Sequence, residues 1–238
     1  VETVWEPGHE EDTIARERGF NWADFYGLCP FPHGSGYLGF LWLFEIEKEL
    51  PRGTNLGKIE VFLASSSDGV TWQRIADQPL IPWDLNFGPE GGMVTTPSSP
   101  VFDDDEIKLY YSDSNYEHGF AERDFDKVLA APTWVIRCAV LKKERLIGAY
   151  SEKGTLEIAN INLKNHYLRL NIDCTGGAIK LEYFKDGKVI ETDNINNIDQ
   201  TDYTPAPLPL TDNVHIIVTL ERATLFAIEV INRFEASK

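Results

Sequence analysis

Two carboxylic acids hold equivalent positions in two successive stretches of the chain. Asp24 stands at the start of a predicted strand, and Glu90 stands in the same relative place one unit later. Two carboxyl groups that face each other can act as a general acid and as a nucleophile or base. Asp24 and Glu90 are therefore the candidates for such a catalytic pair. The structural alternatives are a strand cap for Asp24 and a solvated loop carboxylate for Glu90.

Aromatic and polar residues in predicted loops could hold a sugar. Trp83 and Asp84 follow a proline in one loop, and Tyr116 and His118 lie in another. An exposed aromatic ring can pack against the apolar face of a sugar, while imidazole and carboxylate groups hydrogen-bond its hydroxyls. We expect these four residues to bind substrate. For His118, a plain surface-loop histidine is an equally good interpretation.

No cofactor or metal site is predicted. The acidic run 103–106 lacks the glycine and the spaced oxygen ligands of a calcium loop, and it falls where a hairpin must turn. The sequence has no phosphate-binding glycine loop, nucleophile elbow or zinc-ligand spacing. Cys29, Cys138 and Cys174 are far apart and odd in number, so we expect buried free thiols that do not indicate a compartment.

The charge of the chain argues against two classes of partner. In 238 residues, 38 acidic side chains face 22 basic ones, for a formal charge of −16. Such a charge disfavours binding to nucleic acid or to an anionic membrane surface. The longest apolar run, residues 37–44, is too short to cross a bilayer, so we expect a soluble protein. The chain begins with valine in what resembles the end of a strand, which predicts a fragment.

A hairpin signal at residues 64–75 organises the first part of the chain. Strand-forming residues lead into the turn Asp68-Gly69, and the strand that follows carries Trp72. After a polar segment with at most one helical turn, residues 1–19, two four-stranded antiparallel units follow one another. Successive units of this kind are typical of β-propeller blades. Because two blades cannot close a ring, we predict a partial propeller over residues 1–148.

After residue 148 the pattern changes to short strands separated by turns. Even spacing, period-two alternation and the lack of a helical pattern predict a β-sandwich accessory domain over residues 149–238. The proline-rich segment 205–209 is expected to be a crossing loop, since proline cannot donate a hydrogen bond within a central strand. The predicted fold class is all-β: a partial propeller of about two blades followed by a β-sandwich.

A series of short motifs runs through nearly the whole chain. In order, they are Asp-Phe-Tyr-Gly (24–27), Gly-Tyr-Leu-Gly-Phe (36–40), Ala-Ser-Ser-Ser-Asp-Gly-Val-Thr-Trp-Gln-Arg (64–74), Pro-Leu-Ile-Pro (79–82), Glu-Ile-Lys-Leu-Tyr-Tyr-Ser (106–112), Glu-His-Gly (117–119) and Gly-Thr-Leu (154–156). This series resembles the C-terminal part of the five-bladed β-propeller glycoside hydrolases, in particular proteins similar to glycoside hydrolase families 32 and 43. The motifs are mostly structural.

The resemblance implies an active site in a central funnel. In such enzymes the carboxylates stand at the starts of innermost blade strands, which would make Asp24 and Glu90 two of them and would leave the first acid in a missing first blade. Two departures matter. Asp68 and Gly69 are adjacent, unlike a sialidase Asp-box, and residues 88–93 replace a Trp-Asp-Ser-Gly-like segment.

Two functions from different classes follow from these patterns. The leading hypothesis is a fragment of a glycoside hydrolase acting on an oligo- or polysaccharide, inactive in isolation because an upstream nucleophile is missing. The alternative is a non-catalytic carbohydrate-binding or interaction module. A third hypothesis is a homo-oligomer formed through the open blade edge, because an unpaired edge strand invites pairing.

Overall fold

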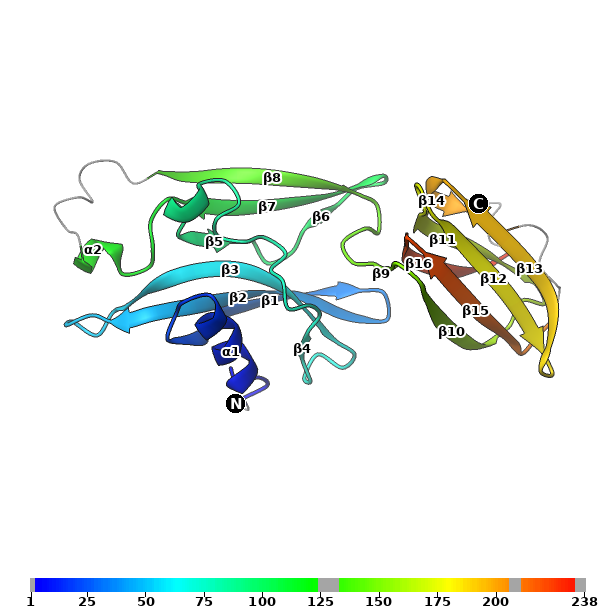
Figure 1. Ribbon diagram of the computed structural model, residues 1–238, viewed down its shortest axis with the longest axis horizontal. Helices are drawn as coiled ribbons and strands as arrows, with labels where there is room; N and C mark the ends of the chain where they lie inside the picture. The colour runs from blue at the N-terminus through cyan, green and yellow to red at the C-terminus, as the bar shows by residue number, and fades with distance from the viewer. Residues whose placement is uncertain (1–2, 124–132, 206–210, 234–238) are drawn as a thin grey trace. The chain divides into compact units, whose positions relative to one another are not determined.

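The computed structural model describes residues 3–123, 133–205 and 211–233 as an all-β protein with two short helices in these ranges (Figure 1). This confirms the predicted fold class at the level of all-β. None of the three sheets formed by the described residues closes on itself. The chain divides into two compact units, Val1–Val101 with Lys108–Val140, and Phe102–Ile107 with Leu141–Lys238.

One eight-stranded sheet dominates the first part of the chain. Its elements are α1 (His9–Glu17), β1 (Trp22–His33), β2 (Gly36–Glu49), β3 (Asn55–Ser66), β4 (Gln73–Arg74), the 3-10 turn η1 (Gly88–Glu90), β5 (Met93–Thr95), β6 (Val101–Phe102), β7 (Glu106–Ser114), α2 (Phe120–Arg123) and β8 (Trp134–Lys142). The strand order is β1-β2-β3-β5-β7-β6, with β4 beside β3 and β8 beside β7. The two predicted four-stranded units therefore share a single sheet, because β5 pairs in parallel with β3.

The hairpin predicted at residues 64–75 forms, although Trp72 lies just before β4 and not on the strand as predicted. β3 and β4 pair with Ala64 opposite Arg74, and Gly69 adopts the positive φ of +77° that the turn requires. Asp68 Oδ1 accepts hydrogen bonds from the backbone N–H groups of Val70 and Thr71, at 2.8 and 2.7 Å. These bonds favour the ionised carboxylate and lower the pKa of Asp68 to about 2. The turn is therefore fixed by the chemistry of its own residues.

The N-terminal segment contains a nine-residue helix, α1, where the sequence predicted at most one turn. Its first turn carries three acidic residues and its last turn carries Arg16, a distribution that complements the helix dipole. Glu11 Oε2 also accepts a hydrogen bond of 2.8 Å from the Gly8 N–H. Ala15 is fully buried against the sheet. Local charge and one buried face therefore stabilise α1.

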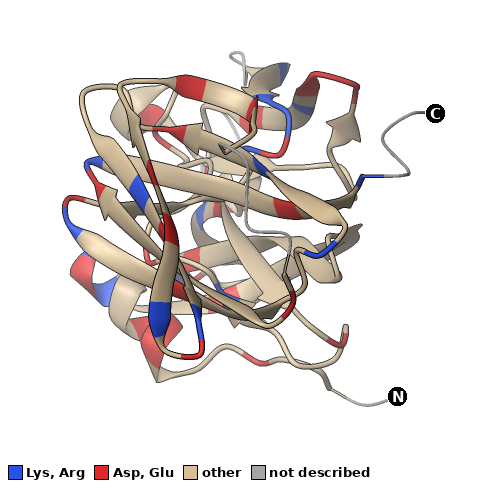
Figure 2. Ribbon diagram, turned by 90° about the vertical axis from the view of Figure 1, so that its right-hand side faces the viewer, with Lys and Arg blue, Asp and Glu red and all other residues tan. Residues whose placement is uncertain are grey.

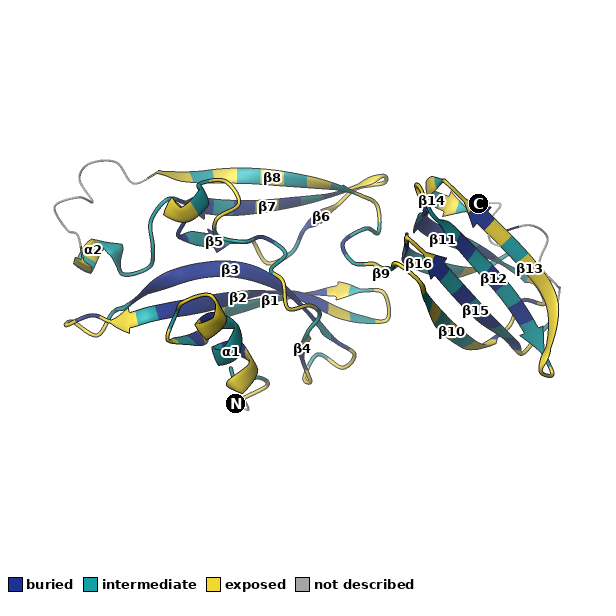
Figure 3. Ribbon diagram, in the orientation of Figure 1, coloured by how far each residue is buried: buried dark blue, intermediate teal, exposed yellow. Residues whose placement is uncertain are grey.

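Both faces of β2 and β3 are covered along most of their length (Figure 3). One face, which we call the helix face, packs Leu43 and Phe62 against α1. The other, which we call the open face, packs Phe44, Ile46 and Ile59 with partly buried aromatic residues. Residues paired across neighbouring strands share a face, so the pairing register assigns every side chain on these strands to one of the two.

The second unit contains two four-stranded sheets, ordered β10-β15-β12-β13 and β14-β11-β16-β9. Their strands are β9 (Ala149–Ser151), β10 (Gly154–Ile161), β11 (His166–Asp173), β12 (Ala178–Lys185), β13 (Lys188–Asn196), β14 (Asp199–Tyr203), β15 (Val214–Glu221) and β16 (Ala223–Asn232). Both sheets contribute to one hydrophobic core, and β15 shows the predicted alternation of buried and half-buried residues. Nearly all of the predicted crossing loop at 205–209 lies outside the described residues.

The three cysteines are free, but they differ in burial. Cys174 is buried as predicted and Cys29 is half-buried, whereas Cys138 is exposed. The prediction for Cys138 is wrong. Exposed and half-buried residues alternate along β8, and Cys138 holds one of the exposed positions. In the part of the chain that the structure describes, neither helix has the length and apolar character needed to cross a bilayer. Acidic side chains are spread over strands and turns (Figure 2).

Candidate functional site

The structure does not bring the two predicted carboxylates, Asp24 and Glu90, side by side. Asp24 lies on β1 opposite Phe44 of β2, which pairs with Ile59 of β3, which in turn pairs with Met93 at the start of β5. Three strand spacings therefore separate Asp24 from Met93, about 14 Å. Glu90 ends the 3-10 turn three residues before Met93. Both carboxylates are exposed, and β2 and β3 lie between their strands.

Asp24 shares the open face with His118. Phe44, the cross-strand partner of Asp24, has its ring centroid 4.8 Å from that of His118. Tyr26 joins them, with its ring 5.4 Å from His118, because it lies two residues after Asp24 on β1 and strand alternation puts both on one face. The open face thus gathers one carboxylate, one imidazole and an exposed phenol.

A hollow of about 600 Å³ adjoins His118. Its lining comes from Arg52, Thr54, Met93 and residues 116–122. The ring of Tyr116 lies 5.7 Å from that of Phe120, and burial raises the pKa of the Tyr116 hydroxyl. His118 is held in place because its Nδ1 lies 2.8 Å from the Asn55 carbonyl oxygen. Two of the predicted sugar-binding residues therefore lie together in one hollow.

Glu122 lines this hollow, and one of its two carboxylate oxygens has no hydrogen-bond partner in the described ranges. Its Oε1 accepts a hydrogen bond of 2.7 Å from the Arg52 N–H, while its Oε2 is buried without a hydrogen-bond partner among the described residues. Glu117 is already engaged, since Arg123 donates to it at 2.6 Å. A carboxylate oxygen without a donor is suited to a ligand hydroxyl. Sequence patterns gave no signal for Glu122.

Trp83 and Asp84 lie elsewhere, near the helix face. The Trp83 indole N–H donates to Glu45 Oε2 at 3.2 Å, and Lys58 Nζ lies 3.5 Å from the Trp83 ring centroid. The Lys58 ammonium group therefore occupies one face of the Trp83 ring, and that face is not free to stack against a sugar. Trp83 and Asp84 do not line the hollow of Tyr116 and His118.

Beneath Trp83 lies a buried acid pair that sequence reasoning missed. Glu45 and Glu60 are both fully buried, on neighbouring strands. Arg18 contacts both: its Nη1 lies 3.1 Å from Glu45 Oε1 and also contacts Glu60, and its Nη2 donates to Glu60 Oε2 at 2.9 Å. The sequence did contain one signal for this pair: a glutamate at an inward-facing position on each of two largely apolar strands. We call Arg18, Glu45 and Glu60 the acid pair cluster.

The electrostatics of this cluster keep one proton on the acid pair near neutral pH. Burial, reinforced by the charge of Glu60, raises the pKa of Glu45 to about 8, although Arg18 opposes the shift. Burial also raises the pKa of Glu60 and lowers that of Lys58. Glu45 is therefore the carboxyl of the pair that holds a proton at pH 7, beside Glu60, which is paired to Arg18.

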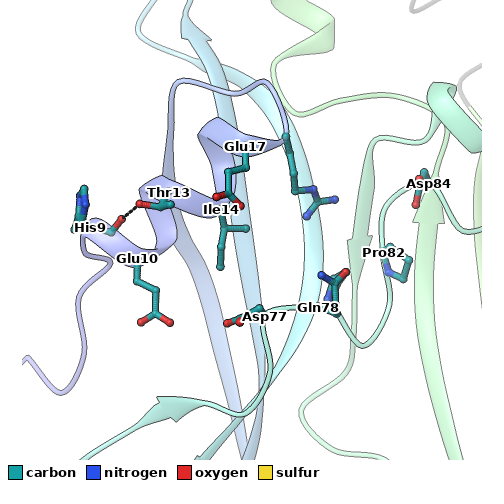
Figure 4. Close-up of a pocket in the computed structure, with 11 residues that line it drawn as sticks. His9, Glu10, Thr13, Ile14, Glu17, Asp77, Gln78, Pro82 and Asp84 are labelled. Atoms are coloured by element: carbon teal, nitrogen blue, oxygen red, sulfur yellow. Dashed lines mark hydrogen bonds between the residues drawn. The ribbon is translucent and has the colours of Figure 1, made fainter.

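A second hollow, of about 990 Å³, lies over Arg18. Figure 4 shows Glu10 and Glu17 of α1 on one side of it and the segment carrying Asp77 and Pro82 on the other. Asp84 and Arg18 complete the lining, whereas Glu45 and Glu60 are not part of it. The acid pair is therefore separated from this hollow by the Arg18 side chain.

Two glycines fix the loop that carries Glu90. A Cβ on Gly91 would lie 1.9 Å from the Trp83 carbonyl oxygen, and a Cβ on Gly92 would lie 1.9 Å from the Tyr116 carbonyl oxygen. The backbone at 91–92 is thus clamped between the loops of Trp83 and Tyr116. Only glycine permits this approach.

The comparisons with known proteins add no family. No protein-family model matches the chain, and no curated protein matches it. Across the described ranges, no group of three or more histidine, cysteine, aspartate or glutamate side chains is arranged to hold a metal ion. A functional proposal therefore depends on the geometry of the two hollows.

Proposed function

We propose that the first unit binds a carbohydrate at the hollow of Tyr116 and His118 and does not cleave it. One observation carries this proposal: two aromatic rings and Glu122, which has one carboxylate oxygen without a partner among the described residues, line the same cavity of about 600 Å³. A ligand with apolar ring faces and many hydroxyls matches such a lining.

Binding without cleavage is favoured by the positions of the carboxylates. Hydrolysis needs two carboxyl groups about 5 to 10 Å apart across the scissile bond. Asp24 lies on β1 and Glu90 in the turn before β5, with β2 and β3 between these two strands, and Glu45 and Glu60 are fully buried. Asp24, on the same face as His118, is suited to hydrogen-bonding a hydroxyl.

We further propose that the fold is a partial β-propeller followed by a β-sandwich. The hairpin of β3 and β4 supports the first part, and two sheets around one core support the second. On this proposal the parent protein is similar to the glycoside hydrolases of families 32 and 43, and this chain carries their C-terminal part.

Titration with a panel of oligosaccharides tests the binding proposal. All six tryptophans lie at or before residue 134, so tryptophan fluorescence reports on the first unit alone. We expect saturable binding by the native chain, with a loss of about tenfold or more, roughly 1.4 kcal/mol, in Tyr116→Ala and in Glu122→Gln. The control is Tyr150→Ala, an exposed tyrosine of the second unit. Equal affinities in all four proteins would refute this site.

A second candidate, hydrolysis of a glycosidic bond, is favoured by the acid pair cluster. A protonated Glu45 can supply the general acid of such a reaction, and Glu60, paired to Arg18, is the second carboxyl group that the reaction needs. Substrate would have to reach the pair by displacing the Trp83 and Asp84 loop. Release of reducing sugar by the native chain, abolished in Glu45→Gln with sugar affinity unchanged, would favour this function. No release from any sugar that binds would reject it.

A further inference from the structure

β8 exposes a row of apolar side chains along its whole length. Its burial alternates between exposed and half-buried residues, visible as bands in Figure 3. Trp134, Ile136 and Val140 are 51%, 71% and 56% exposed, and Cys138 between them is exposed as well. Scattered apolar residues are ordinary on a protein surface, but a continuous row is not.

The opposite side of β8 faces inward. Arg137 Nε donates to Asp113 Oδ2 of β7 at 2.9 Å, and Asp113 is fully buried. Because strand residues alternate, even-numbered residues of β8 and β7 point away from this ion pair. Tyr110 of β7, 41% exposed, therefore lies on the same outer side. We call Tyr110, Trp134, Ile136, Cys138 and Val140 the β8 strip.

The β8 strip combines a free edge with an apolar area of the right size for an interface. Among the described strands, β8 pairs with β7 alone, so its other edge carries unpaired backbone groups. A large aromatic side chain can bury about 150–250 Å², so two half-exposed rings with three smaller apolar side chains offer several hundred Å². A stable interface buries about 800 Å² per partner. The β8 strip therefore supplies a large part of the area that each copy would bury in such an interface.

We propose that the β8 strip is the contact surface for a second copy of this chain. Charge favours this occupant: β8 contains Arg137 and Lys142 but no acidic residue, in a chain of net charge −16. Two such acidic chains repel each other least where carboxylates are missing. A two-fold symmetric contact, with the two strips packed face to face, covers the same residues on both copies.

Measurement of the mass in solution tests this proposal. Light scattering over a range of concentrations should give twice the chain mass of 27.0 kDa. The double variant Ile136→Lys with Val140→Lys should be monomeric and still folded, with the native β-sheet circular-dichroism spectrum and a cooperative unfolding transition. Trp134 is left intact because its ring contacts Tyr116, 5.7 Å away, in the sugar hollow. The matched control is Val189→Lys, which replaces a residue 50% exposed on the second unit and should leave the dimer intact.

Cys138 supplies an independent measurement, since it lies at the middle of β8. A two-fold contact centred there brings the two Cys138 thiols near each other, so a short bis-maleimide should link the chains, and Cys138→Ser should prevent it. A native chain that remains monomeric at every concentration would overturn the proposal and would indicate a different polypeptide as the occupant. A dimer that survives the double lysine substitution, or that is cross-linked equally well without Cys138, would also overturn it.

Discussion

Arg18 Nη2 donates a hydrogen bond of 2.9 Å to Glu60 Oε2, which ties the residue directly after α1 to the middle of β3. The same guanidinium lies 3.1 Å from Glu45 on β2. One arginine therefore compensates two fully buried carboxyl groups and connects the N-terminal helix to the sheet.

Replacing Arg18 by methionine should destabilise the first unit by about 3 kcal/mol, because it leaves buried acids without their partner. Urea unfolding followed by tryptophan fluorescence measures this effect in the first unit. Arg16→Met is the control, since Arg16 forms an exposed pair with Asp12 at 3.0 Å, and such pairs contribute less than about 1 kcal/mol. Equal losses in the two variants would contradict this role of Arg18.

The stability of the first unit should fall as the pH rises from about 4.5 to about 8. Folding raises the pKa of Glu45 from its ordinary value of 4.5 to about 8, so the folded state holds the proton more tightly than the unfolded state does. This stabilisation is fully present below the unfolded pKa and is lost as the pH passes the folded pKa. The slope from Glu45 is at most about 1.4 kcal/mol per pH unit.

Melting temperatures measured across that range check this prediction. Glu45→Gln should show a shallower decline than the native chain. It should not be flat, because burial raises the pKa of Glu60 in the same direction. A native melting temperature that stays constant or rises between these pH values would contradict the assignment.

Gly92→Ala should destabilise the first unit by more than about 2 kcal/mol and should abolish sugar binding. The added Cβ would lie 1.9 Å from the Tyr116 carbonyl oxygen. This oxygen belongs to the backbone, which cannot move aside as the end of a flexible side chain can. Gly34→Ala is the comparison: its φ is +56°, but a Cβ there meets nothing within 4 Å, so we expect a loss of only about 1 kcal/mol. Fluorescence-detected unfolding should rank the two variants in this order.

Asp68→Ala should lower the melting temperature at neutral pH, because it removes the acceptor that closes the β3–β4 turn. The pKa of Asp68 is lowered to about 2, so its contribution is present above the unfolded value of 3.8 and is lost as the pH falls through 2. The difference from the native chain should therefore vanish in strong acid. Asp104→Ala, in another exposed turn, should have little effect at any pH.

Local chemistry explains what the sequence predicted well. Asp68 and Gly69 define a turn through their own hydrogen bonds and backbone preference, and period-two alternation identifies strands wherever one face is buried. The all-β class and most strand positions follow from these signals. The aromatic loop residue Tyr116 and its neighbour His118 were also recognisable as candidates, since both lie near a glycine in the connection between two predicted strands.

Tertiary structure decided which of these residues meet. Asp24 and Glu90 occupy similar places in sequence, yet the pairing of β5 with β3 leaves two strands between them, and no local pattern specifies which strands become neighbours. The acid pair of Glu45 and Glu60 exists only because the register of β2 and β3 aligns two inward positions and α1 delivers Arg18 to them. The sequence by itself therefore determined the turns and strands, whereas long-range strand pairing and helix packing determined where charge and cavities lie.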